Sequence, residues 1–205
     1  LKYNAIIAAV SMTPEASFSS LDSLQADIAE LIDRLPTLKH RQFIQQSLTT
    51  ILRLADSDIE RLDWKILSAA LADMECGFQL FYNYRHVRKI TIFGSARLAP
   101  DSSVYQMAVA FSRTVSGLGF MIMTGGGGGI MQAGQEGAGK ENSFGLNIQL
   151  PFEQQANPII KGDAKLINFK YFFTRKLFFL KESDAVALFP GGFGTQDEAF
   201  ECIVL

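Results

Sequence analysis

The sequence is short of the residues that most often build metal centres, disulfide frameworks and nucleic-acid surfaces. It has two cysteines, Cys76 and Cys202, and two histidines in 205 residues. Two cysteines without a spacing pattern make neither a metal-binding motif nor a disulfide framework, and a reducing cytoplasm is the compartment we expect. Net charge is −2. Without a basic excess, the sequence predicts no binding to nucleic acids or anionic membranes.

Long apolar runs are also missing. The stretch AIIAAV at 5–10 is too short for a signal-peptide core, and no stretch is predicted to span a bilayer. Apolar residues nevertheless make up 48% of the chain and charged residues 20%, which is typical of a globular protein. The chain begins at Leu1 without methionine and ends inside an apolar helical pattern, so we expect further sheet beyond Leu205.

The first 88 residues are predicted to be helical. Apolar residues recur with a helical period over 20–35, 41–55 and 57–84. Ser57 and Glu60 have the spacing of a capping box at the start of the third stretch. Because these stretches carry no convergent polar groups, we interpret residues 1–88 as a helical extension that packs on the rest of the chain or on a partner chain.

From Lys89 onward, short apolar strands that end in glycine alternate with helices. The predicted strands are 89–94, 120–124, 144–150 and 185–189, and the predicted helices are 102–119, 130–140, 171–184 and one that starts near Gln196. This alternation predicts an α/β fold over residues 89–205, a Rossmann-like doubly wound parallel sheet. In such sheets the ligand binds at the carboxyl ends of the strands, at the switch point.

Two glycine-rich loops follow predicted strands and open helices, GGGGG at 125–129 and PGGFGT at 190–195. A helix N-terminus presents free N–H groups and a partial positive charge, and glycine lets an anion approach the backbone, so a phosphate site is predicted. Neither loop is followed by Gly-Lys-Ser/Thr. In GGGGG the last position of G-x-G-x-x-G falls on Ile130, Met131 or Gln132, which disfavours a dinucleotide cofactor.

The residues after the second loop allow two interpretations. Thr195 and Glu198 have the T-x-x-E spacing of a capping box, which would make them ordinary helix-starting residues. That interpretation leaves Gly191, Gly192 and Gly194 unexplained, whereas close approach by a ligand would explain all three.

The segment PGGFGTQDE at 190–198 matches P-G-G-x-G-T-x-x-E and resembles the signature of the LONELY GUY family of nucleoside 5′-monophosphate phosphoribohydrolases. GGGGGIM at 125–131, with one fewer residue between its glycines, is similar to the other glycine loop of that family. FGSAR at 93–97 and TRK at 174–176 resemble its first strand-end loop and its Arg-Lys helix. The N-terminal helices are more like those of the longer bacterial nucleotide nucleosidases.

The resemblance implies hydrolysis of the N-glycosidic bond of a nucleoside 5′-monophosphate, AMP-like or cytokinin-type, without a metal or redox cofactor. It also implies self-association at least as a dimer. By resemblance Arg175 and Glu198 are catalytic, with the carboxylate stabilising an oxocarbenium-like sugar and orienting water. The residues expected to bind phosphate or substrate are Ser95, Gly126, Gly127, Gly129, Met131, Gly191, Gly192, Gly194 and Thr195.

Two questions stay open at this point. On its helix, Arg175 shares a face with Phe178 and Phe179, apart from the face of Phe172 and Leu177, and a charged residue there is ordinarily solvated or paired with a neighbour. The same fold and glycine loops also resemble molybdenum-cofactor carrier proteins and nucleotide sensors, which bind without turnover. The sequence does not indicate which base is preferred.

Overall fold

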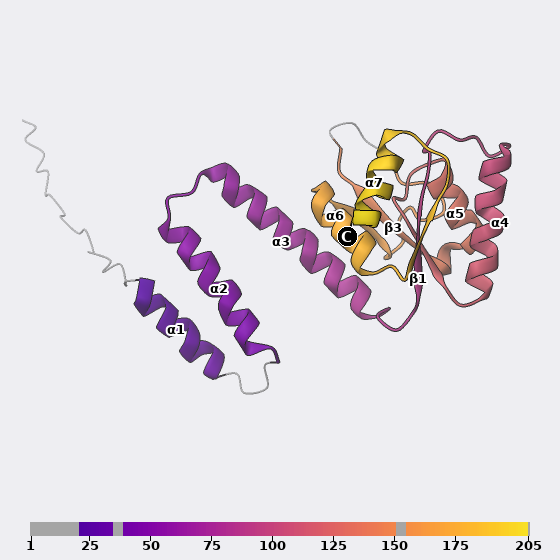
Figure 1. Cartoon of the computed structure of the whole chain (residues 1–205). Coiled ribbons are helices and arrows are strands. Elements are labelled where there is room, and N and C mark those ends of the chain that lie inside the picture. Colours follow the sequence, from indigo (N-terminus) through magenta and orange to yellow (C-terminus); the bar gives the residue numbers. More distant parts are fainter. Residues whose placement is uncertain (1–20, 35–38, 151–154, 205) are drawn as a thin grey trace, which may run out of the picture. The chain divides into compact units, whose positions relative to one another are not determined.

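The computed structural model describes residues 21–34, 39–150 and 155–204 (Figure 1). Its contacts divide the chain into two compact units, Leu1–Trp64, which we call the helical unit, and Lys65–Leu205, the core unit. The division falls inside helix α3 (Arg61–Tyr82). The domain boundary expected after residue 88 rests on sequence pattern alone and stays a prediction.

The helical unit contains α1 (Leu21–Asp33) and α2 (Arg41–Asp56), which pack against each other. Ile32 is buried, and the Arg41 guanidinium donates to its carbonyl at 2.9 Å. The helices predicted over 20–35 and 41–55 from their helical period are therefore confirmed. The expected capping box is wrong: Ser57 ends α2, its hydroxyl donating to the Leu54 carbonyl at 3.1 Å, and α3 begins later.

The core unit is built on a sheet of five parallel strands, in the order β4-β3-β2-β1-β5. The strands are β1 (Lys89–Phe93), β2 (Met121–Thr124), β3 (Ser143–Ile148), β4 (Leu166–Phe169) and β5 (Ala185–Leu188). This confirms the Rossmann-like α/β fold. The sequence pattern missed β4, because this four-residue edge strand is only partly buried and lacks a continuous apolar run.

Helices cover both faces of this sheet (Figure 1). α4 (Ser103–Gly117) and α5 (Ile130–Ala138) pack with Ile92 and Ile122 on one side, and a short 3-10 helix (Lys140–Asn142) follows them. α6 (Phe172–Lys181), α7 (Phe193–Val204) and the later part of α3 pack with Phe93 and Met123 on the other side. Because both faces are covered, β1, β2 and β3 are buried throughout.

The strand order reverses between β1 and β5. The chain passes from β1 through β2 and β3 to β4 in one direction and then returns to place β5 beside β1, with Phe93 opposite Leu188. The loops that leave β1 and β5 therefore diverge at this point and open a crevice at the carboxyl ends of the strands. Among the described residues, no helix is long and apolar enough to cross a membrane.

Candidate active site

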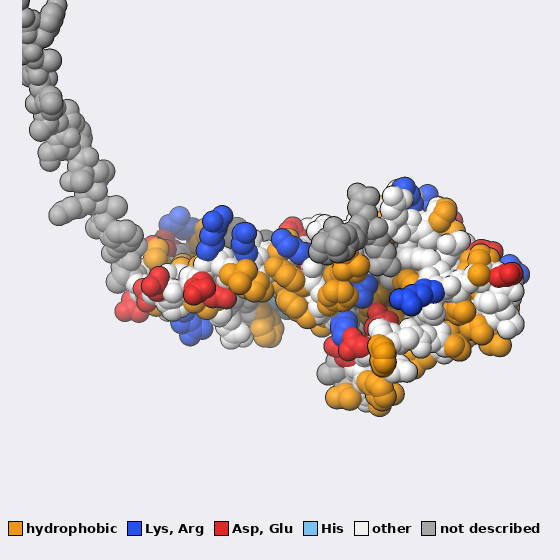
Figure 2. All heavy atoms as spheres, turned by 90° about the horizontal axis from the view of Figure 1, so that it is seen from above, with side chains coloured by type: hydrophobic (Ala, Val, Ile, Leu, Met, Phe, Trp, Pro, Cys, Tyr) orange, Lys and Arg blue, Asp and Glu red, His pale blue; other side chains and the backbone are white. Residues whose placement is uncertain are grey.

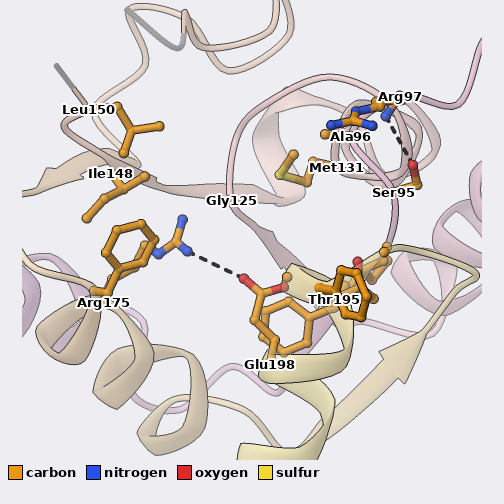
Figure 3. A pocket seen from close by; sticks show the side chains of 17 residues that line it. Ser95, Ala96, Arg97, Gly125, Met131, Ile148, Leu150, Arg175, Thr195 and Glu198 are labelled. Carbon is orange, nitrogen blue, oxygen red and sulfur yellow. Dashed lines mark hydrogen bonds and ion pairs between the residues drawn. The ribbon is translucent and has the colours of Figure 1, made fainter. Parts of the chain in front are cut away.

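A cavity of about 500 Å³ lies at this switch point (Figure 3). It is lined by the loop after β1, the first glycine loop, the end of β3, α6 and the start of α7. The lining residues are Ile92, Phe93, Gly94, Ser95, Ala96, Arg97, Gly125, Met131, Ile148, Leu150, Phe172, Arg175, Gly192, Phe193, Gly194, Thr195 and Glu198. The position predicted from the strand pattern is therefore correct, and both predicted catalytic residues face the same space.

Ser95 joins the two glycine loops through its backbone. Its N–H donates to the Pro190 carbonyl at 3.1 Å, and its carbonyl accepts the N–H of Ile130 at 3.0 Å. Its hydroxyl accepts the N–H of Arg97 at 3.2 Å on the cavity wall (Figure 3). The short FGSAR turn thus fixes the distance between the start of α5 and the loop that precedes α7.

The second glycine loop places a helix N-terminus at the cavity. α7 begins at Phe193, three residues earlier than predicted, and the N–H of Gln196 bonds to the Gly192 carbonyl at 3.1 Å. The N–H groups of Phe193, Gly194 and Thr195 precede the first intrahelical bond of this kind and lack helical acceptors. Thr195 therefore lies inside the first turn, and the capping-box interpretation of Thr195 and Glu198 is wrong.

The glycines of this loop are required for different reasons. A Cβ on Gly191 would lie 2.2 Å from the Thr195 hydroxyl oxygen, so the fold itself requires glycine there. A Cβ on Gly192 or Gly194 would meet nothing within 4 Å. Both of these residues line the cavity. Free space beside their backbone leaves room for a ligand to approach the N–H groups.

The first glycine loop mainly holds itself in place. The N–H of Gly126 donates to the Thr124 hydroxyl at 3.1 Å, and the buried Asn157 amide donates to the carbonyls of Gly126 and Gly127 at 3.0 and 2.9 Å. A Cβ on Gly129 would lie 2.2 Å from the Ser95 carbonyl oxygen. Of the five glycines, Gly125 lines the cavity, whereas Gly126, Gly127 and Gly129, the three predicted to bind substrate, do not.

Arg175 and Glu198 meet across the cavity from α6 and α7 (Figure 3). The Nη2 of Arg175 lies 3.4 Å from Oε1 of Glu198, and the two side chains are 10% and 21% exposed. Burial raises the pKa of Glu198, and the arginine only partly offsets this. Burial likewise lowers the pKa of Arg175 against the opposing effect of the carboxylate. Each charge is thus held where water stabilises it poorly.

The hydrogen bonding of this pair is incomplete. At 3.4 Å the contact is long for a charge-assisted hydrogen bond. The Nε of Arg175 is buried and has no hydrogen-bond partner among the described residues. The guanidinium instead lies 5.2 and 5.6 Å from the ring centroids of Phe172 and Phe179. A buried donor without a partner beside an open cavity is a position where a ligand oxygen would be stabilised.

The pattern of apolar residues in α6 does not show which face of the helix is buried. Arg175 is buried together with Thr174, Phe178 and Phe179. Phe172, Phe173 and Leu177, on the face that looks more apolar, are 51%, 57% and 43% exposed. The expectation that the Arg175 face is solvated is therefore wrong, because the sheet and α7 cover it.

Lys176 holds α6 and α7 together outside the cavity. Its Nζ lies 2.7 Å from Oδ2 of Asp197 and 2.7 Å from Oε2 of Glu201. These hydrogen bonds raise the pKa of the lysine. The two helices that carry Arg175 and Glu198 are thus joined by two ion pairs, and the residues of one of them, Lys176 and Asp197, directly adjoin Arg175 and Glu198 in the sequence.

Sequence reasoning missed several residues of the cavity wall. Arg97 lies two residues after Ser95 in the FGSAR turn. Ile148 and Leu150 lie at the end of a predicted strand, and this position could have identified them as residues of the ligand site. Among the described residues of the wall, the charged side chains are Arg97, Arg175 and Glu198, which gives these residues an excess of one positive charge. Figure 2 shows basic and acidic side chains next to one another on this side of the core unit.

Residues 123–205 match the sequence model of a family described as "Possible lysine decarboxylase". The matched segment contains both glycine loops, Arg175 and Glu198. Over these residues the chain is similar to that family. The resemblance to the LONELY GUY family, which shares this family model, is thereby confirmed.

Two solved structures are similar to this chain. One is the X-ray structure of TM1055, with 23% identity and a TM-score of 0.45 over 57% of this chain and 69% of that one. The other is the Moco carrier protein of Chlamydomonas reinhardtii, with 19% identity and a TM-score of 0.45 over 58% of this chain and 72% of that one. No significant match was found among curated proteins.

Proposed function

We propose that the protein hydrolyses the N-glycosidic bond of a nucleoside 5′-monophosphate, releasing the free base and ribose 5-phosphate. The observation that carries the proposal is the pairing of Glu198 with Arg175 in the same cavity as the free helix N-terminus at 193–195. A binding protein needs only the helix N-terminus. A buried carboxylate whose ionised form is poorly stabilised is the additional group that this hydrolysis requires.

The phosphate is assigned to the start of α7. The N–H groups of Phe193, Gly194 and Thr195 are free of helical partners, and the helix dipole favours an anion there. The excess positive charge of the cavity wall acts in the same direction. A volume of about 500 Å³ is within the usual range for a ligand of nucleotide size.

Glu198 and Arg175 are assigned to the sugar. In the reaction the bond between C1′ and the base nitrogen breaks, a water oxygen bonds to C1′, and the departing nitrogen gains a proton. The Glu198 carboxylate stabilises the positive charge that develops on the ribose and orients the water. Arg175 favours the ionised form of this carboxylate and donates its free Nε–H to a substrate oxygen. Ile148, Leu150 and Met131 supply an apolar surface for the base.

The residues give no support to lysine decarboxylation, the reaction named in the family description. Lys176, next to Arg175, is held between Asp197 and Glu201, and no lysine is among the described residues that line the cavity. The preferred base, adenine, cytokinin-type or another, is left to the assay.

The test is to incubate the protein with AMP and, in parallel, with adenosine, and to measure released adenine by chromatography. We expect adenine and an equal amount of ribose 5-phosphate from AMP, and much slower release from adenosine, which lacks the phosphate. A panel of other nucleoside 5′-monophosphates then gives the base preference. Binding of nucleoside 5′-monophosphates without release of any base would refute the enzymatic function and favour a carrier or sensor.

A further inference from the structure

The helix that carries Arg175 starts without a capping side chain of its own. Tyr171, the N-cap residue of α6, makes no side-chain hydrogen bond to the helix. The two backbone N–H groups just before the helix and one hydroxyl of its first turn are bonded from α3 instead. The Asp73 carboxylate accepts the N–H of Lys170 at 3.0 Å and that of Tyr171 at 3.1 Å, and it also accepts the Thr174 hydroxyl at 2.6 Å.

This contact is buried and charged. Asp73 is 8% exposed and lies at the N-terminal end of α6, where the helix dipole favours a negative charge. A buried carboxylate that accepts two backbone N–H groups and a hydroxyl fixes the first turn of a helix in both position and rotation. The residue after Thr174 is Arg175.

The next turns of α3 set the distance between the two helices. Gly77 lies one turn after Asp73, and a Cβ there would be 2.2 Å from the ring of Phe178, so the ring packs directly on the α3 backbone. Phe81, another turn on, stacks with Phe178 at 6.0 Å between ring centroids. Residues 73, 77 and 81 thus form one face of α3 that holds α6.

Arg175 depends on this support more than a fully bonded arginine would. Its guanidinium has one long contact to Glu198 and two flanking rings, and its Nε has no partner among the described residues. Few direct bonds orient the head group, so its place in the cavity follows from where the α6 backbone lies. The α6 backbone in turn is held at its start by Asp73.

We propose that Asp73 is a positioning residue for Arg175. Through Asp73, α3 supports the active site from outside the cavity by holding the start of α6 in place. The inference rests on the proposed function for its effect on turnover. Its effect on the start of α6 does not depend on that function.

The test compares Asp73→Asn with Glu75→Gln, a matched loss of one carboxylate from the exposed side of the same helix, where Glu75 contacts only Gln79 in the described hydrogen bonds. Asp73→Asn should lower kcat for AMP by about ten- to a hundredfold, the usual effect of misplacing a catalytic group by roughly 1 Å. Nucleotide affinity should change by less than about threefold, because the phosphate site on α7 is intact. Glu75→Gln should behave as wild type.

A double-mutant cycle separates positioning from general stability. In an Arg175→Ala background, Asp73→Asn should lower the remaining turnover by less than about twofold, because the residue that it positions is gone. An undiminished effect in that background would overturn the inference, as would wild-type kcat in Asp73→Asn itself.

Amide hydrogen exchange supplies a measurement that needs no turnover. Residues 170–176 should exchange faster in Asp73→Asn than in wild type or Glu75→Gln, while β1 and β2 keep their protection. If the wild-type protein binds AMP but releases no base, the proposed function fails and the exchange comparison still applies. Unchanged exchange over 170–176 would then refute the role of Asp73.

Discussion

Gly194 and Gly191 show how neighbouring glycines can be required for different reasons. A methyl group on Gly194 meets no protein atom within 4 Å but would enter the space proposed for the phosphate. We therefore predict that Gly194→Ala keeps the melting temperature of wild type and weakens AMP binding by about tenfold or more, the loss of roughly one charge-assisted contact. Isothermal titration with AMP and with adenosine measures the difference.

The controls for this prediction lie in the same chain. Gly117→Ala, at the end of α4 where a Cβ also meets nothing, should alter neither stability nor affinity by much. Gly191→Ala should instead lower stability, because its Cβ would lie 2.2 Å from the Thr195 hydroxyl oxygen. If Gly194→Ala binds AMP as tightly as wild type does, the phosphate does not lie at these N–H groups.

Glu198 should reduce the stability of the fold at neutral pH. Its pKa in the folded protein is raised above the ordinary 4.5, even with Arg175 beside it. The folded state therefore binds the proton more tightly than the unfolded state, and stability falls as pH rises from 4.5 through the folded pKa. Glu198→Gln cannot ionise and should melt a few degrees above wild type near neutral pH.

A series of melting curves at different pH values checks this sign. The advantage of Glu198→Gln should disappear below pH 4.5, where the wild-type glutamate is protonated in both states. A variant that melts below wild type near neutral pH would mean that the ion pair with Arg175 outweighs the cost of burial. The geometry of the pair, 3.4 Å and with one donor unpaired, argues against that outcome.

The contact between α3 and α6 is a property of whole elements, and Gly77 tests it. Because a Cβ at this position would lie 2.2 Å from the buried Phe178 ring, Gly77→Ala must separate the helices or displace the ring. We expect a loss of about 1–3 kcal/mol in the free energy of unfolding, the usual cost of overpacking. Denaturant titration measures it, with Gly117→Ala as the control.

An increase in stability would contradict this packing. Alanine favours a helix interior over glycine by roughly 0.5–1 kcal/mol, so a free α3 surface at this position would be stabilised by the substitution. The two interpretations thus predict changes of opposite sign.

The elements also show which parts of the fold can be predicted from sequence. Apolar strands that end in glycine gave the core strands and their helices, because a two-sided parallel sheet requires continuous apolar runs. The edge strand β4 does not meet that requirement and was missed. The burial of Arg175 on α6 was not predicted, since it is decided by α7 and the sheet, which the period of a single helix does not report.

The candidate site was predicted in part for similar reasons. Arg175 and Glu198 came from the resemblance, and their contact required the folded chain. Gly126, Gly127 and Gly129 belong to the motif, but they serve to fix the loop. Asn157 bonds the carbonyls of Gly126 and Gly127, and Gly129 packs against the Ser95 carbonyl. Of the loop, Gly125 lines the cavity. Asp73 acts on a helix start a hundred residues away, a relation that no local pattern contains.

At the scale of the whole molecule, self-association stays a prediction from the resemblance. Apolar side chains gather on one edge of the core unit (Figure 2), and in α7 Phe200, Ile203 and Val204 are 65%, 74% and 81% exposed. Surfaces of this kind commonly bind a partner chain. We expect sedimentation equilibrium to give a dimer or a larger assembly at micromolar concentration, and a monomer there would contradict the prediction.

The central claim is that the core unit performs chemistry on a nucleotide rather than only holding it, and Glu198→Gln tests this most directly. Glutamine keeps the size of the side chain and removes the charge that an oxocarbenium-like ribose needs. The measurement is kcat for adenine release from AMP together with the affinity for AMP, on the same preparations. We predict a loss of about a hundredfold or more in kcat, with AMP affinity near that of wild type. Equal turnover by Glu198→Gln and wild type would contradict the account.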